Sequence, residues 1–151
     1  MIELDPIAVV RNSRKTVEDD QWGEVVSTIE LLPPLTAEAL TGIESFSHLE
    51  VIYYFDRVQT AKIETGARHP RNNPDWPLVG ILAQRGKNRP NQIGVTICKL
   101  LEHNGSSITV KGLDAVDGTP ILDIKPVMKE FLPKEDIRQP DWVGELMQNY
   151  W

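Results

Sequence analysis

Two polar segments hold most of the residues in this chain whose types could carry chemistry. The first runs from Arg85 to Gly94 and contains three cationic side chains, two asparagines and a proline. Arginine presents paired planar donors that match carboxylates and phosphates, so this segment suits an anionic ligand. The second runs from Gly112 to Pro126 and contains three aspartates among small and apolar residues. Asp117 fits a common Asp-Gly-Thr turn, whereas that turn does not explain Asp114 and Asp123.

Other kinds of reactive site find little support in the sequence. Neither G-x-G-x-x-G nor G-x-x-x-x-G-K-[ST] occurs, so both common phosphate-binding loops are absent. His48, His69 and His103 are far apart, and only folding would assemble them into a metal site. Cys98, the single cysteine, excludes an intrachain disulfide, and its apolar neighbours indicate an inert core thiol. We therefore expect a site without a metal ion.

Four short motifs occur in the order that is typical of one protein family. They are Phe46–Leu49, Arg89–Gly94, Leu113–Pro120 and Asp123–Pro126. Together they resemble the TsaA-like family, whose named members are TrmO-type tRNA methyltransferases, over about residues 7–126. The resemblance implies a small β-barrel that binds S-adenosylmethionine without a dinucleotide-binding (Rossmann) sheet. That implication agrees with the missing glycine-rich loop.

The resemblance also implies an activity and partners. It implies methylation of N6 of the threonylcarbamoyl-adenosine beside the anticodon of certain tRNAs. It further implies a homodimer with the cofactor near the subunit interface. Two alternatives stay open, namely an S-adenosylmethionine-dependent methyltransferase for another acceptor and a non-catalytic barrel that binds a cofactor or nucleotide.

Alignment with the family assigns cofactor contacts to ten residues. They are Trp22, Gly23, Asp56, Arg57, Arg85, Val95, Lys111, Gly112, Leu113 and Asp114. We expect Arg85 to pair with the carboxylate of the cofactor and Asp114 to accept a hydrogen bond from its ribose or amino group. Asp114 and Asp117 are the two candidates for a catalytic carboxylate, although Asp117 suits a turn better than proton transfer.

A second group of residues is expected to contact nucleic acid. Arg89, Asn91 and Lys125 suit phosphate or the carboxylate of the modified base. Trp76 suits either stacking on an unpaired base or anchoring of its own loop.

The chain departs from the family pattern at four places. A proline of the family is Gln92 here, a tyrosine is Val127, and a His-Gln pair is Asp56-Arg57. Larger bacterial members also continue into a C-terminal domain, whereas residues 127–151 here suggest a short extension. Because of these departures, the resemblance implies the cofactor site more firmly than it implies the tRNA substrate.

Short strands, in which apolar and polar residues alternate, must position these residues. The clearest predicted strand is His48–Val58, in which Leu49, Val51, Tyr53 and Phe55 share one face. Further strands are predicted at Ile7–Val10, Gly23–Leu31, Leu78–Ala83, Ile93–Leu101, Ser106–Lys111 and Pro120–Ile124. Short helices are predicted at residues 36–40 and 141–150, and residues 65–77 are expected to form a long mobile connection. The pattern predicts a mainly β, antiparallel barrel or sandwich of six or seven strands, and the resemblance selects the barrel.

The composition is that of one ordinary globular domain, covering residues 1–151. The chain has a mass of 17.1 kDa, with 40% apolar and 25% charged residues. The net charge is −6, yet residues 57–111 carry 9 basic and 3 acidic side chains, which favours a local positive face. No apolar run reaches the ~20 residues of a membrane span, and the acidic N-terminus does not resemble a signal peptide. We therefore expect a cytoplasmic protein.

Overall fold

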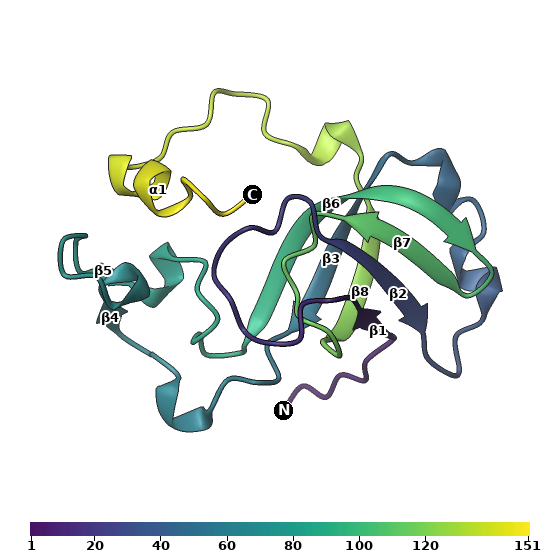
Figure 1. Cartoon of the computed structure of the whole chain (residues 1–151), viewed down its shortest axis with the longest axis horizontal. Coiled ribbons are helices and arrows are strands. Elements are labelled where there is room, and N and C mark those ends of the chain that lie inside the picture. Colours follow the sequence, from purple (N-terminus) through teal and green to yellow (C-terminus); the bar gives the residue numbers. More distant parts are fainter.

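Six antiparallel strands close into a barrel in the computed structural model, which describes residues 1–151. The barrel order is β1-β2-β7-β6-β3-β8, and β8 closes the circle onto β1 (Figure 1). The strands are β1 (Ala8–Arg11), β2 (Val26–Leu31), β3 (His48–Tyr54), β6 (Ile93–Asn104), β7 (Ser107–Lys111) and β8 (Pro120–Pro126). The prediction of a mainly β, antiparallel barrel is therefore confirmed.

Alternation along the strands fills the barrel with apolar side chains. In β3, Leu49, Val51 and Tyr53 are buried, as the period-two pattern predicted, while the residues between them face outward. The core is a single cluster whose members come from every strand of the barrel. It comprises Ala8, Val10, Ile29, Leu40, Leu49, Val51, Tyr53, Cys98, Ile108, Val110, Leu113, Ala115 and Ile121.

The long strand β6 shapes the barrel because it pairs with two neighbours in succession. Its first half pairs with β3, and its second half forms the hairpin with β7 around Gly105, which has a positive φ of 61°. The register shifts between Leu100 and Glu102, where the strand leaves β3 for β7. Such a bulge bends a strand and increases its twist, which allows one strand to follow the curve of a small barrel.

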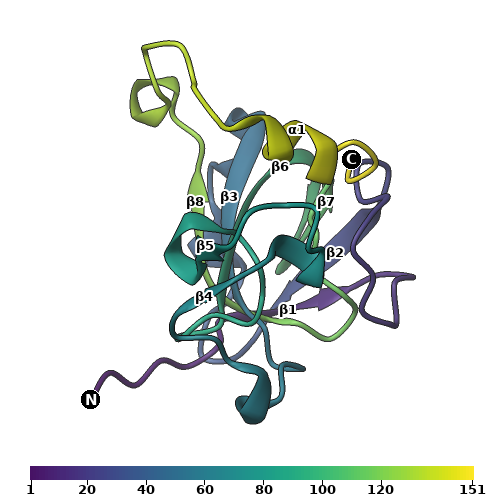
Figure 2. The same cartoon turned by 90° about the vertical axis from the view of Figure 1, so that its left-hand side faces the viewer.

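The remaining elements are short and lie outside the barrel. β4 (Ala67–Arg68) and β5 (Val79–Gly80) form a two-stranded ladder, and α1 (Asp141–Leu146) is the only α-helix. Six single-turn 3-10 helices complete the fold, at Ala37–Leu40, Ile43–Ser45, Thr60–Lys62, Pro70–Asn72, Ile81–Ala83 and Lys129–Phe131. Figures 1 and 2 both place α1 and the C-terminus near one end of the barrel.

Several predicted boundaries were wrong. Only Val79–Gly80 of the predicted strand Leu78–Ala83 is extended, and Ile81–Ala83 is a 3-10 helix outside the barrel. The Gln84 side chain donates to the carbonyls of Val79 and Arg68 and so ties the end of this segment back to the ladder. This ladder also gives the predicted connection 65–77 a defined structure.

Two other elements end earlier than the sequence suggested, and one begins later. β3 stops at Tyr54, because turn-type bonds follow in which Asp56 N donates to Tyr54 O and Val58 N donates to Phe55 O. The predicted helix over residues 141–150 is α-helical only to Leu146, and the chain then tightens into turns with bonds between residues three apart. The predicted strand from Gly23 begins only at Val26, where pairing with Lys111 starts.

Candidate functional site

One end of the barrel gathers most of the predicted cofactor residues. Antiparallel pairing brings the ends of β3 and β7 and the beginnings of β2 and β6 together there, as the pairs Val26–Lys111 and Tyr54–Ile93 show. After β7 the chain turns at Gly112, whose φ of +84° lies in the left-handed region that glycine adopts without strain. The turn directs Leu113 into the core, where it is fully buried, and leaves Asp114 half-buried at the end of the barrel.

The carboxylate of Asp114 accepts hydrogen bonds from three hydroxyl groups. Tyr53 Oη lies 3.0 Å from Oδ1, and Thr96 Oγ1 also donates to Oδ1. Oδ2 accepts from the hydroxyl of Tyr150, which approaches from the C-terminal end of the chain. Tyr53 and Thr96 are buried, and apart from this carboxylate their hydroxyls have only longer contacts, from Tyr53 Oη to the Asp114 carbonyl at 3.3 Å and to Thr96 Oγ1 at 3.4 Å. The three hydroxyls therefore fix the orientation of this carboxylate.

Both tyrosines stay protonated and act as donors. Burial raises the pKa of Tyr53 far above its usual range, and the nearby negative charge of Asp114 raises it further. The pKa of Tyr150 is raised by the same two causes, in the same order. Both hydroxyls are therefore protonated at neutral pH and serve as hydrogen-bond donors.

The close approach of β3 and β6 explains the glycine at the end of the Arg89–Gly94 motif. A Cβ atom on Gly94 would lie 2.5 Å from the ring of Tyr53 and 2.9 Å from the ring of Phe55. These two rings pack edge to face, with their centroids 5.3 Å apart. Gly94 thus leaves the space in which Tyr53 reaches Asp114.

Arg85 lies next to this cluster and carries an available positive charge. Its Nη2 donates to the carbonyl of Val95 at 2.6 Å, and Val95 directly precedes Thr96 on β6. The side chain is exposed, and no carboxylate lies within 4.0 Å of its guanidinium group. Its charge also acts on Tyr53, lowering the pKa of that hydroxyl slightly against the larger raising effects. Through Val95, the Arg85 side chain is thus attached to β6 one residue before Thr96, which bonds Asp114.

Trp22 and Gly23 form the next side of the site. Trp22 is buried beneath Arg14, whose guanidinium carbon lies 4.1 Å from the centre of the indole ring. The carbonyl oxygen of Gly23 faces Gly112. A Cβ atom added to Gly112 would lie 3.8 Å from this oxygen. Lys111 points elsewhere, since its Nζ pairs with Glu24 at 2.7 Å.

Asp56 and Arg57 belong to a neighbouring set of contacts. Both are exposed, and Arg57 donates to the carbonyls of Lys15 and Asp117 rather than to the Asp114 cluster. The Asp117 carboxylate accepts from the backbone N of Asn12 and pairs with Lys15 at 2.9 Å. These two contacts lower the pKa of Asp117, with Lys15 as the larger cause. Asp117 therefore makes the contacts of a turn residue.

The predicted RNA-binding residues come from two different elements, a loop and a strand. Arg89 donates to the carbonyls of Gln84 and Gly86 and so organises its own loop, where Asn91 is exposed. Lys125 lies on β8 opposite Glu50 and pairs with Asp123 at 3.0 Å. Trp76 anchors its loop, because its Nε1 donates to Glu145 of α1 at 2.7 Å.

The sequence analysis missed three residues of the site, namely Tyr53, Thr96 and Tyr150. Tyr53 and Thr96 did carry a signal, because each is a polar side chain at an inward-facing position of an apolar strand and needs a partner inside the protein. Tyr150 carried none, since 36 residues separate it from Asp114 and no periodicity connects them.

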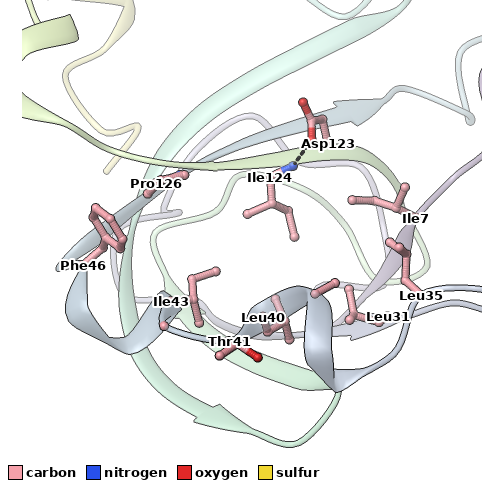
Figure 3. A pocket seen from close by; sticks show the side chains of 12 residues that line it. Ile7, Leu31, Leu35, Leu40, Thr41, Ile43, Phe46, Asp123, Ile124 and Pro126 are labelled. Carbon is pink, nitrogen blue, oxygen red and sulfur yellow. Dashed lines mark hydrogen bonds between the residues drawn. The ribbon is translucent and has the colours of Figure 1, made fainter.

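An apolar groove lies at the opposite end of the barrel. It has a volume of about 500 Å³ and lies where β1 begins and where β2 and β8 end (Figure 3). Its lining is mostly apolar and contains none of the predicted cofactor residues. The one acidic side chain there, Asp123, bonds the backbone N of Ile124.

The structure offers neither a candidate metal site nor a candidate membrane-spanning helix. No three histidine, cysteine, aspartate or glutamate side chains are grouped so that they could hold a metal ion. None of the helices combines the length and the apolar character needed to cross a membrane.

The chain is similar to proteins that are named as methyltransferases or as S-adenosyl-L-methionine-binding proteins. Residues 16–131 match the family model of the tRNA-methyltransferase O N-terminal domain. A probable S-adenosyl-L-methionine-binding protein of Pyrococcus abyssi is 34% identical over 154 residues, which cover 99% of this chain and 78% of that protein. Human tRNA (adenine(37)-N6)-methyltransferase is 33% identical over 102 residues, or 68% of this chain and 23% of the human protein.

A solved structure has the same fold. The crystal structure of TrmO from Pseudomonas aeruginosa superposes with a TM-score of 0.72 at 28% identity. The match covers 91% of this chain and 61% of that chain. The chain thus spans less than two thirds of the solved TrmO chain and about a quarter of the human enzyme.

Proposed function

Because the chain belongs to the family of the tRNA-methyltransferase O N-terminal domain, we propose that it is an S-adenosylmethionine-dependent tRNA methyltransferase. The acceptor we propose is N6 of the threonylcarbamoyl-adenosine beside the anticodon. The observation that carries the proposal is the gathering of Arg85, Val95, Gly112 and Asp114, all expected cofactor contacts, at one barrel end within the family match.

The chemistry of these residues fits the proposed cofactor. Its methionine part carries a carboxylate and an amino group, and the site offers the unpaired Arg85 guanidinium for the first and the Asp114 carboxylate for the second. Asp114 could equally accept from the ribose hydroxyls. Gly23 and Gly112 present backbone without side chains between them, and such positions let a ligand approach the main chain closely.

The proposed reaction needs alignment more than it needs a reactive side chain. When bound, S-adenosylmethionine supplies a methyl group on a sulfonium centre, which is open to in-line displacement. Arg85 and Asp114 would fix the polar groups of the ligand, and holding reactants in the correct geometry accounts for much of the rate gain of such reactions. Tyr53 and Thr96 contribute by keeping Asp114 in one orientation.

We place the tRNA on the basic part of the surface and propose a cytoplasmic homodimer. Arg89 and Asn91, in the loop beside Arg85, would contact the tRNA backbone or the modified base. Exposed apolar side chains at Ile97, Phe131 and Leu132 offer a patch for a second copy. A monomeric mass by light scattering would contradict the dimer.

The decisive experiment transfers a labelled methyl group from S-adenosylmethionine to tRNA that lacks the modification. We expect labelled tRNA with the unaltered chain and none with Asp114→Ala. Asp123→Ala is the matched control, because that aspartate lies on β8 and bonds only Ile124 and Lys125. Label on another acceptor would replace the tRNA in the proposal, and bound cofactor without any transfer would indicate a non-catalytic binding barrel.

The Asp114→Ala variant should also be less stable. Removal of the carboxylate takes away the acceptor of the Thr96 hydroxyl and leaves the Tyr53 hydroxyl only the backbone carbonyl of residue 114 and the Thr96 hydroxyl, at a cost of about 1–3 kcal/mol. Circular dichroism must therefore establish that the variant is folded at the assay temperature. A folded variant that binds S-adenosylmethionine as tightly as the unaltered chain in calorimetry would refute the site.

A further inference from the structure

The second carboxylate oxygen of Asp114 is bonded by a residue from outside the family match. That match ends at residue 131, whereas the hydroxyl that donates to Asp114 Oδ2 belongs to Tyr150. Asp114 Oδ2 is also the atom left free by Tyr53 and Thr96, which both donate to Oδ1. The Tyr150 hydroxyl therefore takes the position in which a hydroxyl or amino group of the cofactor would donate.

Backbone contacts seat the same segment on two more of the expected cofactor residues. The backbone N of Gln21 donates to Asn149 O at 3.0 Å, and that of Trp22 donates to Tyr150 O at 2.8 Å. The backbone of Trp151 lies so close to Gly23 that a Cβ on this glycine would stand 2.7 Å from it. Residues 149–151 thus cover Trp22, Gly23 and Asp114 at once.

The attachment of this segment to the rest of the protein is shallow. All residues from 131 to 141 are exposed, and none of residues 142–151 is fully buried. α1 itself is held by the bond from Trp76 Nε1 to Glu145 and has no residue in the core cluster. A segment with few buried contacts can detach without unfolding the barrel.

From these contacts we propose that residues 149–151 are a tethered plug of the cofactor site, which S-adenosylmethionine displaces when it binds. This inference rests on the proposed function. The tether keeps the plug at a high effective concentration beside the site, so the closed state dominates in the absence of ligand. The apparent affinity for the cofactor is then reduced by the fraction of molecules in which the plug is open.

Calorimetric titration with S-adenosylmethionine tests the plug in three variants. Ending the chain after Gln148 removes the plug, and Tyr150→Phe removes only its hydroxyl. Tyr54→Phe is the matched control, because this half-buried tyrosine bonds Gln92 rather than Asp114. We expect the Kd to fall by about tenfold for the shortened chain and several-fold for Tyr150→Phe, with no change for the control. An equal or higher Kd for the shortened chain would overturn the plug.

Hydrogen exchange of the Gln21 and Trp22 amides gives a second, independent readout. Both amides donate to the plug, so their exchange should accelerate when S-adenosylmethionine is added to the full chain. Cofactor binding that leaves both amides protected would overturn the plug while the proposed function stands. Failure of both the full and the shortened chain to bind S-adenosylmethionine would instead overturn the proposed function, and the plug with it.

Discussion

At the scale of single residues, the candidate site depends on one carboxylate and on the space around its partners. Asp114 is oriented by hydroxyls from β3, from β6 and from the C-terminal segment. The Tyr53 hydroxyl reaches it only because Gly94, across the ladder, has no side chain where the Tyr53 ring lies. The glycine therefore acts through the tyrosine, and its effect should be visible in both stability and ligand binding.

Gly94→Ala tests this dependence. The added methyl group would overlap the rings of Tyr53 and Phe55, which the surrounding core holds in place. We expect a loss of about 1–3 kcal/mol in the free energy of unfolding, together with weaker binding of S-adenosylmethionine. Urea denaturation and calorimetry measure the two effects.

Gly86→Ala is the matched control, because Gly86 belongs to the same polar segment and a Cβ on it would meet nothing within 4 Å. We expect it to change stability by less than about 1 kcal/mol. Equal stability of both variants would mean that the Tyr53 ring has room to move, and the positioning role of Gly94 would be wrong.

At the scale of elements, β6 connects the candidate site with the far end of the barrel. Its first residues include Gly94 and Thr96, and Cys98 follows in the core, where burial raises the pKa of the thiol to about 12.

The turn that leads into β6 is unusual, because Gln92 has a positive φ of 51° and its side chain bonds Phe55 O. Proline cannot adopt that φ, so the Gln92 departure from the family pattern fits a different turn.

The other end of β6 carries a histidine whose contacts require a positive charge. His103 Nδ1 lies 3.0 Å from Glu44 Oε2, and Nε2 lies 2.8 Å from the carbonyl of Gly105. Both partners are acceptors, so both ring nitrogens must carry protons. The hydrogen bond to Glu44 is the largest cause of the raised pKa of His103, and the carbonyl of Gly105 adds to it.

This pair predicts a pH dependence with a definite sign. The folded pKa of His103 is raised, so its stabilisation is complete below the unfolded pKa of about 6.5 and is lost as the pH rises through the folded value. The pKa of Glu44 is lowered, so its part is lost only in acid, as the pH falls through the folded value. The melting temperature of the unaltered chain should therefore fall relative to that of His103→Gln above neutral pH. Parallel curves between about pH 5 and 9 would contradict the pair.

At the scale of the whole molecule, charge is distributed unevenly, which favours an anionic partner. Of the nine cations between residues 57 and 111, only Arg71 and Lys111 form ion pairs. The others lack a carboxylate within 4.0 Å, so their potential is not cancelled locally. Local potential of this kind attracts a polyanion even when the net charge of the protein is −6.

Arg89→Ala tests whether this charge binds RNA. We expect weaker binding of tRNA and a shallower dependence of log K on log salt concentration, because fewer counterions are released. Arg89→Lys keeps the charge and should retain the slope. Arg138→Ala, in the exposed stretch 131–141, is the control for a cation outside the proposed surface. Filter binding at several salt concentrations measures the slope, and identical slopes for all variants would contradict the proposed RNA surface.

The sequence by itself determined the class of fold and the segments that carry chemistry. Two of the signals are local: the inward-facing residues at every second position of β3, and the Asn-Gly turn between β6 and β7. Each depends on neighbouring residues in the sequence and not on where the strand lies in the fold. The motif residues near Arg85 and Asp114 were found in the same way, from short stretches of chain. The predicted strand Leu78–Ala83 was wrong except at Val79–Gly80, and the Gln84 side chain ties the end of this segment back to the ladder.

Tertiary structure alone decided which of these residues meet. Asp114 bonds Tyr53 because antiparallel pairing brings the ends of β3 and β7 to one end of the barrel, and it bonds Tyr150 because the chain returns there after α1. Lys125 and Arg89 were both predicted to contact RNA, yet Lys125 lies on β8 and pairs with Asp123, whereas Arg89 lies in a loop and donates to backbone carbonyls. Periodicity reports which face of an element is buried, whereas the partners of that face depend on how the whole chain packs.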